Sequence, residues 1–207
     1  MTRICLNTAY LAPISYYYEL FNCEYIEIDA WGYYIKQTYR NRCNIIAANG
    51  IMPLSIPVEK PTTGKCPTRD IRISSHDNWQ HLHWNAIVSA YSSTPFFEYY
   101  QDDFFPFYKN NAAGKFLFDF NESLRETICS LLGINPDITY SPEYKTVFEP
   151  DETDFREAIH PKHPVDTGFV AQPYYQVFAD RHGFIPDMSI IDLLFNTGPE
   201  ALLTLQR

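Results

Sequence analysis

The sequence lacks the glycine-rich motifs by which many phosphate-binding enzymes are identified. Glycine supplies only 8 of the 207 residues, and neither Gly-x-Gly-x-x-Gly nor a Walker loop occurs. A Gly-x-Ser-x-Gly nucleophile elbow is absent as well. Any phosphate must therefore be bound by side chains or by a helix N-terminus, such as the one expected after residues 10–13.

Long apolar runs are also missing. No stretch approaches the length of a membrane-spanning helix, and the N-terminus shows neither the apolar core nor the cleavage site of a secretory signal. The 5 cysteines are odd in number, widely spread and without a Cys-x-x-Cys pair. Such usage is typical of reduced thiols, so we expect a cytoplasmic protein. Cys43 follows Arg42, and a neighbouring cation lowers the pKa of a thiol, but a buried structural thiol is the favoured interpretation.

Metal-ligand spacing is absent too. His81 and His83 stand two apart on an expected helix, about 200° around its axis, so they do not face one metal. His160 and His163 lie in a polar loop with no carboxylate or cysteine at ligand spacing. We therefore expect neither a metal nor a cofactor.

Cations are scarce and unevenly placed. The chain carries 16 Lys and Arg against 25 Asp and Glu, a net charge of -9 that disfavours non-specific binding to nucleic acid. Three of the cations nevertheless fall within residues 36–42. Arg40 and Arg42 would share one face of an extended strand, and paired guanidiniums suit a phosphate or a carboxylate. A charged edge strand that prevents aggregation, or that pairs with acidic neighbours, is the alternative favoured on this pattern alone.

Alternating short runs and helical periods predict an α/β fold. Strands are expected at residues 3–10, 25–29, 53–58, 70–74 and 138–140. Helices are expected after Pro13 and at residues 75–91, 96–108, 118–133, 187–196 and 199–205. Asn49-Gly50 predicts an antiparallel hairpin, and residues 141–166 show no period and are expected to be irregular. The length fits one domain over residues 1–207, with a mixed β-sheet, flanking helices and a helical C-terminal half.

Four segments together resemble the WbqC-like protein family of bacteria. They are residues 9–17, residues 34–42, His83-Trp84 to Tyr91 with Pro95-Phe96-Phe97, and residues 185–196. The last is the most specific, because a chain of this composition would rarely contain the run Ser-Ile-Ile-Asp-Leu-Leu-Phe-Asn by chance. The chain departs from the family pattern at Thr8-Ala9-Tyr10, where Gln-Pro-Tyr is usual, and over residues 140–172, which are shorter and more diverged.

The resemblance implies a cytoplasmic protein of bacterial surface-polysaccharide (O-antigen) biosynthesis. Members are suspected of helping to attach an acyl or aminoacyl group to an amino sugar. The matching positions are Tyr10, Pro13, Lys36, Asn41, Arg42, His83, Asp187, Ser189, Asp192 and Asn196. The position of Arg40 is often apolar in the family, so Lys36, Asn41 and Arg42 are the preferred anion-binding set and Arg40 is expected to face solvent.

Two functional hypotheses follow. The first is a transferase acting on a nucleotide-linked amino sugar, with that sugar or an acyl donor as its partner. Its substrate-binding residues would be Tyr10, Tyr34, Lys36, Tyr39, Asn41 and Arg42, and its catalytic candidates His83 and Asp187. A buried core histidine is the alternative for His83, and a helix cap is the alternative for Asp187. The second hypothesis is a non-catalytic binding or assembly protein whose aromatic residues 96–108 form a partner surface.

Overall fold

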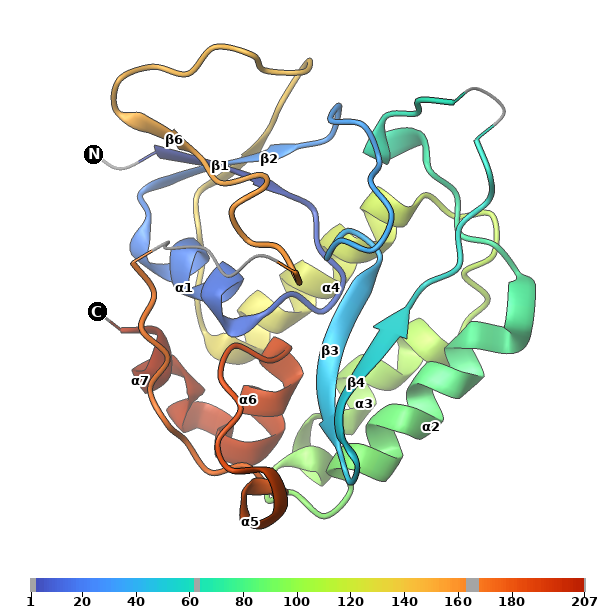
Figure 1. The fold of residues 1–207 in the computed structure, drawn as a ribbon, viewed down its shortest axis with the longest axis vertical. Coiled ribbons are helices and arrows are strands. Elements are labelled where there is room, and N and C mark those ends of the chain that lie inside the picture. The colour runs from blue at the N-terminus through green and yellow to red at the C-terminus, as the bar shows by residue number, and fades with distance from the viewer. Residues whose placement is uncertain (1–2, 62–63, 163–167, 207) are drawn as a thin grey trace.

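Parallel strands form the larger of two sheets in the computed structural model, which describes residues 3–61, 64–162 and 168–206 (Figure 1). The strands are β1 (Arg3–Asn7), β2 (Tyr25–Asp29), β5 (Ile138–Tyr140) and β6 (Glu152–Asp154), in the order β5-β2-β1-β6. A second sheet is the antiparallel hairpin of β3 (Arg42–Ala47) and β4 (Gly50–Ser55). The predicted α/β class is confirmed, with the parallel and antiparallel pairs divided between two sheets.

The order of the parallel strands changes direction at β1. Helix α1 (Ile14–Asn22) connects β1 to β2. The two strands pair with each other from Arg3 opposite Tyr25 to Asn7 opposite Asp29. Strand β6 pairs with the other edge of β1. In open parallel sheets, ligands bind beyond the carboxyl ends of the strands at such a switch point. The fold therefore marks the carboxyl ends of β1 and β6 for inspection.

The helices are concentrated after the hairpin. They are α2 (Trp79–Tyr91), α3 (Phe97–Lys109), α4 (Leu117–Leu132), α5 (Ala179–His182), α6 (Ile190–Thr197) and α7 (Ala201–Leu205), with the short turns η1 (Thr68–Asp70), η2 (His76–Asn78) and η3 (Gly198–Glu200). Strand β3 lies between α2 and α6 (Figure 1). It accepts the Ser189 backbone N–H at the Asn44 carbonyl, 2.9 Å away, and its Ile46 N–H donates to the hydroxyl of Tyr91 at 3.2 Å.

Both predicted glycine stops are confirmed. Helix α4 ends at Gly133, whose φ of +69° lies in the left-handed region that glycine enters without strain. Helix α6 ends before Gly198, where φ is +58° and an added Cβ would stand 2.5 Å from the Phe96 ring. The predicted hairpin is confirmed as well, because Ala47 pairs with Gly50 across a two-residue turn.

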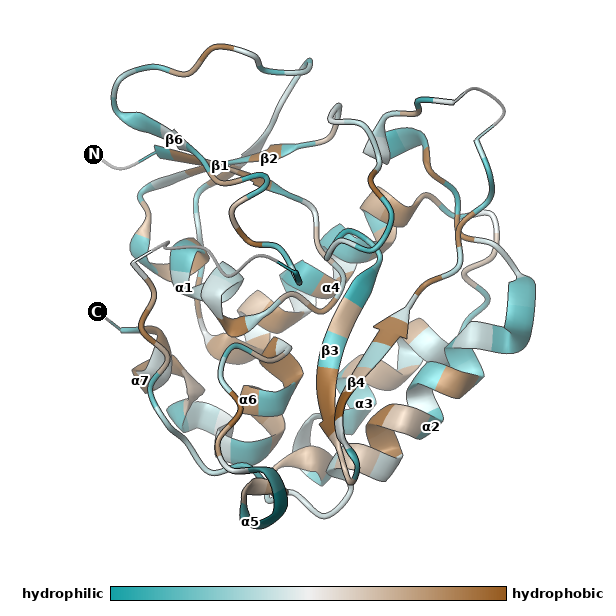
Figure 2. Cartoon of the chain, in the orientation of Figure 1, coloured by the Kyte–Doolittle hydropathy of each residue, from teal (hydrophilic) through white to brown (hydrophobic). Residues whose placement is uncertain are grey.

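The C-terminal helices pack their apolar side chains into the same core as the central helices. Figure 2 shows hydrophobic segments along β3 and α6, and a hydrophilic α5 at the surface. Phe195 of α6 is fully buried, with its ring centroid 5.2–5.5 Å from those of Tyr91, Phe97 and Phe104. Burying one such side chain contributes about 1.5–3 kcal/mol. The position of α6 is thus fixed mainly by apolar packing.

Two local predictions are wrong. Residues 70–74 do not form a strand of a sheet, because their backbone bonds alternate between two neighbours: Ile73 bridges Val58 and Arg72 bridges Phe116. Residues 141–166 are not wholly irregular, since they contain β6, which pairs with β1. A three-residue strand shows no readable period, and its partner lies about 150 positions earlier in the chain.

Candidate functional site

A small hollow opens where β1 and β6 end. It is called the strand-end hollow below, and its lining residues are Leu6, Asn7, Thr8, Ala9, Tyr16, Thr38, Tyr39, Arg40, Phe155, Arg156, Ile159 and His160. Its open volume is about 20 Å³, which holds about one water molecule. The hollow lies at the switch point of the parallel sheet, the place where such folds bind ligands.

Arg40 points into this hollow. Its side chain is only 5% exposed, and its Nη2 donates to Oε1 of Glu157 at 2.9 Å. Its Nη1 lies 3.3 Å from the Thr38 hydroxyl, while its Nε has no hydrogen-bond partner. The expectation that Arg40 faces solvent is therefore wrong. The reason is a turn over residues 36–41, in which Gln37 has a φ of +62°, so Arg40 and Arg42 do not share the face of one strand.

The preferred set of Lys36, Asn41 and Arg42 is not assembled by the fold. Lys36 is exposed on the turn. Asn41 is buried and donates from Nδ2 to the Ile56 carbonyl at 2.8 Å, with its Oδ1 unpartnered. The Nε of Arg42 donates to the Ser55 hydroxyl at 2.9 Å, along the β3-β4 hairpin. Of the three cations in residues 36–42, Arg40 is the one that lines the strand-end hollow.

The Arg156 side chain joins the carboxyl ends of two parallel strands, β2 and β6. Its Nε and Nη2 donate to the Asp154 carboxylate at 2.9 and 2.8 Å, and its Nη1 donates to Asp29 Oδ2 at 2.9 Å. These hydrogen bonds, those to Asp154 first, raise the pKa of Arg156 further above its ordinary value. The guanidinium also stacks on Tyr144 and Phe148. With both carboxylates already paired to it, Arg156 holds the sheet together and leaves Arg40 as the more available cation.

A second buried ion pair supports the hollow from α4. Glu122 accepts from the Thr8 hydroxyl at 2.8 Å and from Arg125 Nε at 2.8 Å. Both charged side chains are about 8% exposed. Neither residue is predicted as functional from the sequence, although opposite charges three apart beside the apolar stripe of a helix are the available signal. Their contact with Thr8 fixes the chain immediately after β1.

Tyr10 and His83 meet in an aromatic cluster. The Tyr10 hydroxyl lies 2.9 Å from His83 Nδ1 and 2.8 Å from the Tyr108 hydroxyl. The His83 ring packs edge-on against Trp79, with centroids 5.0 Å apart. Burial lowers the pKa of His83 to about 4, against a smaller opposing effect of a hydrogen bond to the Ser55 backbone. His83 is thus neutral at pH 7 in the setting of a core histidine, and its catalytic role stays a prediction.

Asp187 caps a helix other than its own. Its Oδ1 accepts the Ser15 backbone N–H at 2.8 Å and its Oδ2 accepts the Ser15 hydroxyl at 2.9 Å. Ser15 lies in the first turn of α1, where free N–H groups need acceptors. Burial raises the pKa of Asp187, and the bonds from Ser15 oppose that rise. The geometry gives Asp187 a structural task, and its catalytic role also stays a prediction.

The remaining predicted residues are spread around these sites. Tyr39 is half-buried, lines the strand-end hollow and accepts the Tyr10 backbone N–H at its carbonyl, 2.8 Å away. Tyr34 is half-buried, and burial raises its pKa to about 12. Cys43 is buried, and burial raises its thiol pKa, so Arg42 does not activate it. His163 lies outside the described residues.

Half of the eight aromatic residues expected to form a partner surface are buried. Phe97, Tyr100, Phe104 and Tyr108 of α3 are buried. Tyr99 is 74% exposed and Phe105 37% exposed. Over the part of the chain that the structure describes, no three His, Cys, Asp or Glu side chains group as metal ligands do. Within the same residues, no helix has the length and apolar character needed to cross a membrane.

Comparison with protein-family models identifies one family. A family model described as the WbqC-like protein family matches residues 8–160, a span that begins and ends at lining residues of the strand-end hollow. The uncharacterized protein Rv1507c of Mycobacterium tuberculosis (strain ATCC 25618 / H37Rv) is similar, with 27% identity over 228 residues that cover 97% of this chain and 96% of the relative. No solved structure matches.

Proposed function

Because the chain belongs to the WbqC-like protein family, we propose that it is a transferase of bacterial surface-polysaccharide biosynthesis that binds a nucleotide-linked amino sugar at the strand-end hollow. The transferred group would be an acyl or aminoacyl group. In this proposal Arg40 binds the phosphates of the substrate, in place of the set Lys36, Asn41 and Arg42.

One observation carries the proposal: a buried arginine at the switch point is paired with a surface carboxylate. The Arg40 side chain is 5% exposed, whereas its partner Glu157 is 59% exposed. A guanidinium binds phosphate oxygens as well as it binds a carboxylate, through the same parallel N–H donors. A substrate phosphate can therefore replace the Glu157 carboxylate while Arg40 stays in position.

Residues 155–162, the cover segment, decide access to the hollow. The segment is attached at one end by Asn7 Nδ2, which donates to the Arg156 carbonyl, and by the Arg156 side chain. Farther along, its contacts to residues 36–42 are Arg40 with Glu157 at 2.9 Å and Lys162 Nζ with Gln37 Oε1 at 2.6 Å. Substrate binding thus requires the segment beyond Arg156 to move and to break these two contacts.

His83 is kept outside this site. With a pKa near 4 it is a weak base at neutral pH, and its Nδ1 is already bonded to Tyr10. It is also absent from the lining of the hollow. In this proposal it holds the Tyr10 side chain, and the Tyr10 backbone is bonded to Tyr39 at the edge of the hollow; a catalytic role for His83 stays a prediction.

Calorimetric titration with UDP-N-acetylglucosamine tests the proposal. Arg40→Gln is expected to weaken binding by at least about tenfold, because the lost bonds are charge-assisted and shielded from water. Glu157→Gln is expected to tighten binding by about threefold, because it removes the carboxylate that competes for Arg40. Glu143→Gln, a change at an exposed acid, is the matched control and should leave affinity unchanged.

Titrations with UDP and with inorganic phosphate separate the parts of the ligand. Retained binding of UDP with weak binding of phosphate would show that the nucleotide contributes. Equal affinity of the wild type and Arg40→Gln for UDP-N-acetylglucosamine would overturn the proposal, and so would weaker binding by Glu157→Gln.

A further inference from the structure

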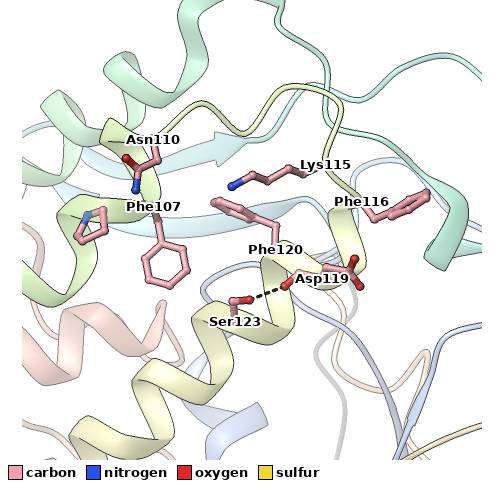
Figure 3. Close-up of a pocket in the computed structure, with 8 residues that line it drawn as sticks. Phe107, Asn110, Lys115, Phe116, Asp119, Phe120 and Ser123 are labelled. Carbon is pink, nitrogen blue, oxygen red and sulfur yellow. Dashed lines mark hydrogen bonds between the residues drawn. The ribbon is translucent and has the colours of Figure 1, made fainter.

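A second, larger cavity lies between the end of α3 and the start of α4. Its volume is about 460 Å³, within the range of small-molecule sites, and it shares no lining residue with the strand-end hollow. The walls are formed by Phe107, Phe116 and Phe120, with the polar side chains of Lys115, Asn110 and Asp119 around them (Figure 3). This cavity is called the aromatic pocket below.

The aromatic walls are held in place by packing behind them. Phe107 and Phe120 meet edge to face, with centroids 5.8 Å apart at 88°. Phe120 is 6% exposed and is backed by Trp79 at 5.8 Å and Tyr10 at 6.3 Å. The Arg72 guanidinium lies 4.0 Å from the centre of the Phe116 ring. The pocket is therefore preformed, and an apolar ligand would not have to reorganise these rings to bind.

Two polar side chains at the pocket have unused donors. Among the described residues, the ammonium of Lys115 makes no ion pair, although acidic residues outnumber basic ones 25 to 16. Asn110 is exposed, and its printed hydrogen bond is made by the backbone carbonyl, which accepts Gln80 Nε2 at 2.7 Å, and not by its amide side chain. Figure 3 shows the Lys115 side chain extending toward Asn110 above Phe107 and Phe120.

We propose that the aromatic pocket binds a small apolar carboxylate, meaning an aromatic ring or short acyl chain that carries a single carboxylate group. The apolar part would lie against Phe107 and Phe120, and the carboxylate would accept hydrogen bonds from Lys115 and Asn110. Asp119 also lines the pocket, and its charge disfavours ligands with more negative charge, such as phosphate esters. This inference is independent of the proposed transferase, because it concerns a different cavity.

The test compares matched ligands by NMR titration of the ¹⁵N-labelled protein. 3-Phenylpropionate is expected to bind in the millimolar range, as the size of the ligand allows, with shift changes at α3 and α4. The neutral 3-phenylpropanol, which keeps the ring and loses the charge, is expected to bind about tenfold more weakly. Hexanoate, an aliphatic carboxylate, distinguishes a preference for a ring from a preference for an acyl chain.

A lysine variant tests the charge directly. Lys115→Met keeps the apolar stem and is expected to weaken 3-phenylpropionate about tenfold without changing the affinity for 3-phenylpropanol. Lys60→Met, at an exposed lysine outside the pocket, is the control and should change neither. The proposal is overturned if the acid binds no better than the alcohol, if Lys115→Met has no effect, or if no carboxylate binds at about 10 mM.

Discussion

Arg40 and Arg42 stand two positions apart, yet one guanidinium is buried beside Glu157 and the other lies along the hairpin beside Ser55. The left-handed backbone at Gln37 and the turn after it separate them. Arg40 Nε is left without a partner, and an unpaired buried donor costs about 1–3 kcal/mol. A buried residue that carries this cost beside the carboxyl ends of parallel strands is more consistent with ligand binding than with stability alone.

His83 provides a pH test at the residue scale. Its pKa is about 4 in the folded protein and 6.5 when unperturbed. The unfolded chain therefore binds a proton between these values that the folded protein does not, so the free energy of unfolding falls as the pH drops from 6.5 to 4. The loss is on the order of 3 kcal/mol. Urea unfolding of the wild type and His83→Gln measures this loss. The free energy of unfolding of the wild type should exceed that of the variant by an amount that shrinks as the pH is lowered.

His81→Gln is the control for that measurement. His81 is exposed two residues away, with its Nε2 beside Asn85. Its variant should follow the wild-type pH profile. Parallel profiles for the wild type and His83→Gln would contradict the buried, neutral state of His83.

At the scale of elements, the sequence predicts helix ends and turns correctly where a local residue preference determines them. Gly133 and Gly198 end helices because each requires a left-handed backbone, and Gly50, with a φ of +103°, follows the two-residue turn of the hairpin for a similar reason. Strand β6 has no such signal, since it exists only by pairing with β1. The partner of Arg40 lies 117 positions away, and that of Asp187 lies 172 away, so neither burial nor capping could be derived from neighbours in the sequence.

Helix α6 supplies an element-scale prediction about stability. Phe195→Ala removes a fully buried ring that touches three other aromatic rings, and is expected to lower the free energy of unfolding by about 3–5 kcal/mol. Leu203→Ala on α7, where the side chain is 65% exposed, should change it by about 0.5 kcal/mol or less. Urea denaturation measures both. A small effect at Phe195 would mean that α6 is not an anchor of the core.

At the scale of the whole molecule, α4 connects the two cavities. Phe120 forms a wall of the aromatic pocket, and the next residue, Asn121, donates to the Arg40 carbonyl at 2.8 Å. Glu122 then binds Thr8 at the strand-end hollow. The first turns of one helix therefore position residues at both places. The assignment of residues 1–207 to a single domain stays a prediction, although one core cluster contains residues from β1 to α7.

The negative net charge of the molecule makes a local cation such as Arg40 necessary for binding a diphosphate. At -9 overall, the chain repels a diphosphate unless cations are gathered locally. The turn of residues 36–41 brings one cation, Arg40, to the lining of the strand-end hollow, and Lys36 is exposed on the same turn. Family membership is shown by the match over residues 8–160, and the substrate is the part that experiment has to decide.

A crystal structure of the complex with UDP-N-acetylglucosamine tests the central claim most directly. The account predicts the diphosphate within hydrogen-bonding distance of Arg40, with the Glu157 carboxylate displaced and residues 157–162 moved away from the hollow. A diphosphate bound elsewhere, with the Arg40–Glu157 pair intact, would contradict it.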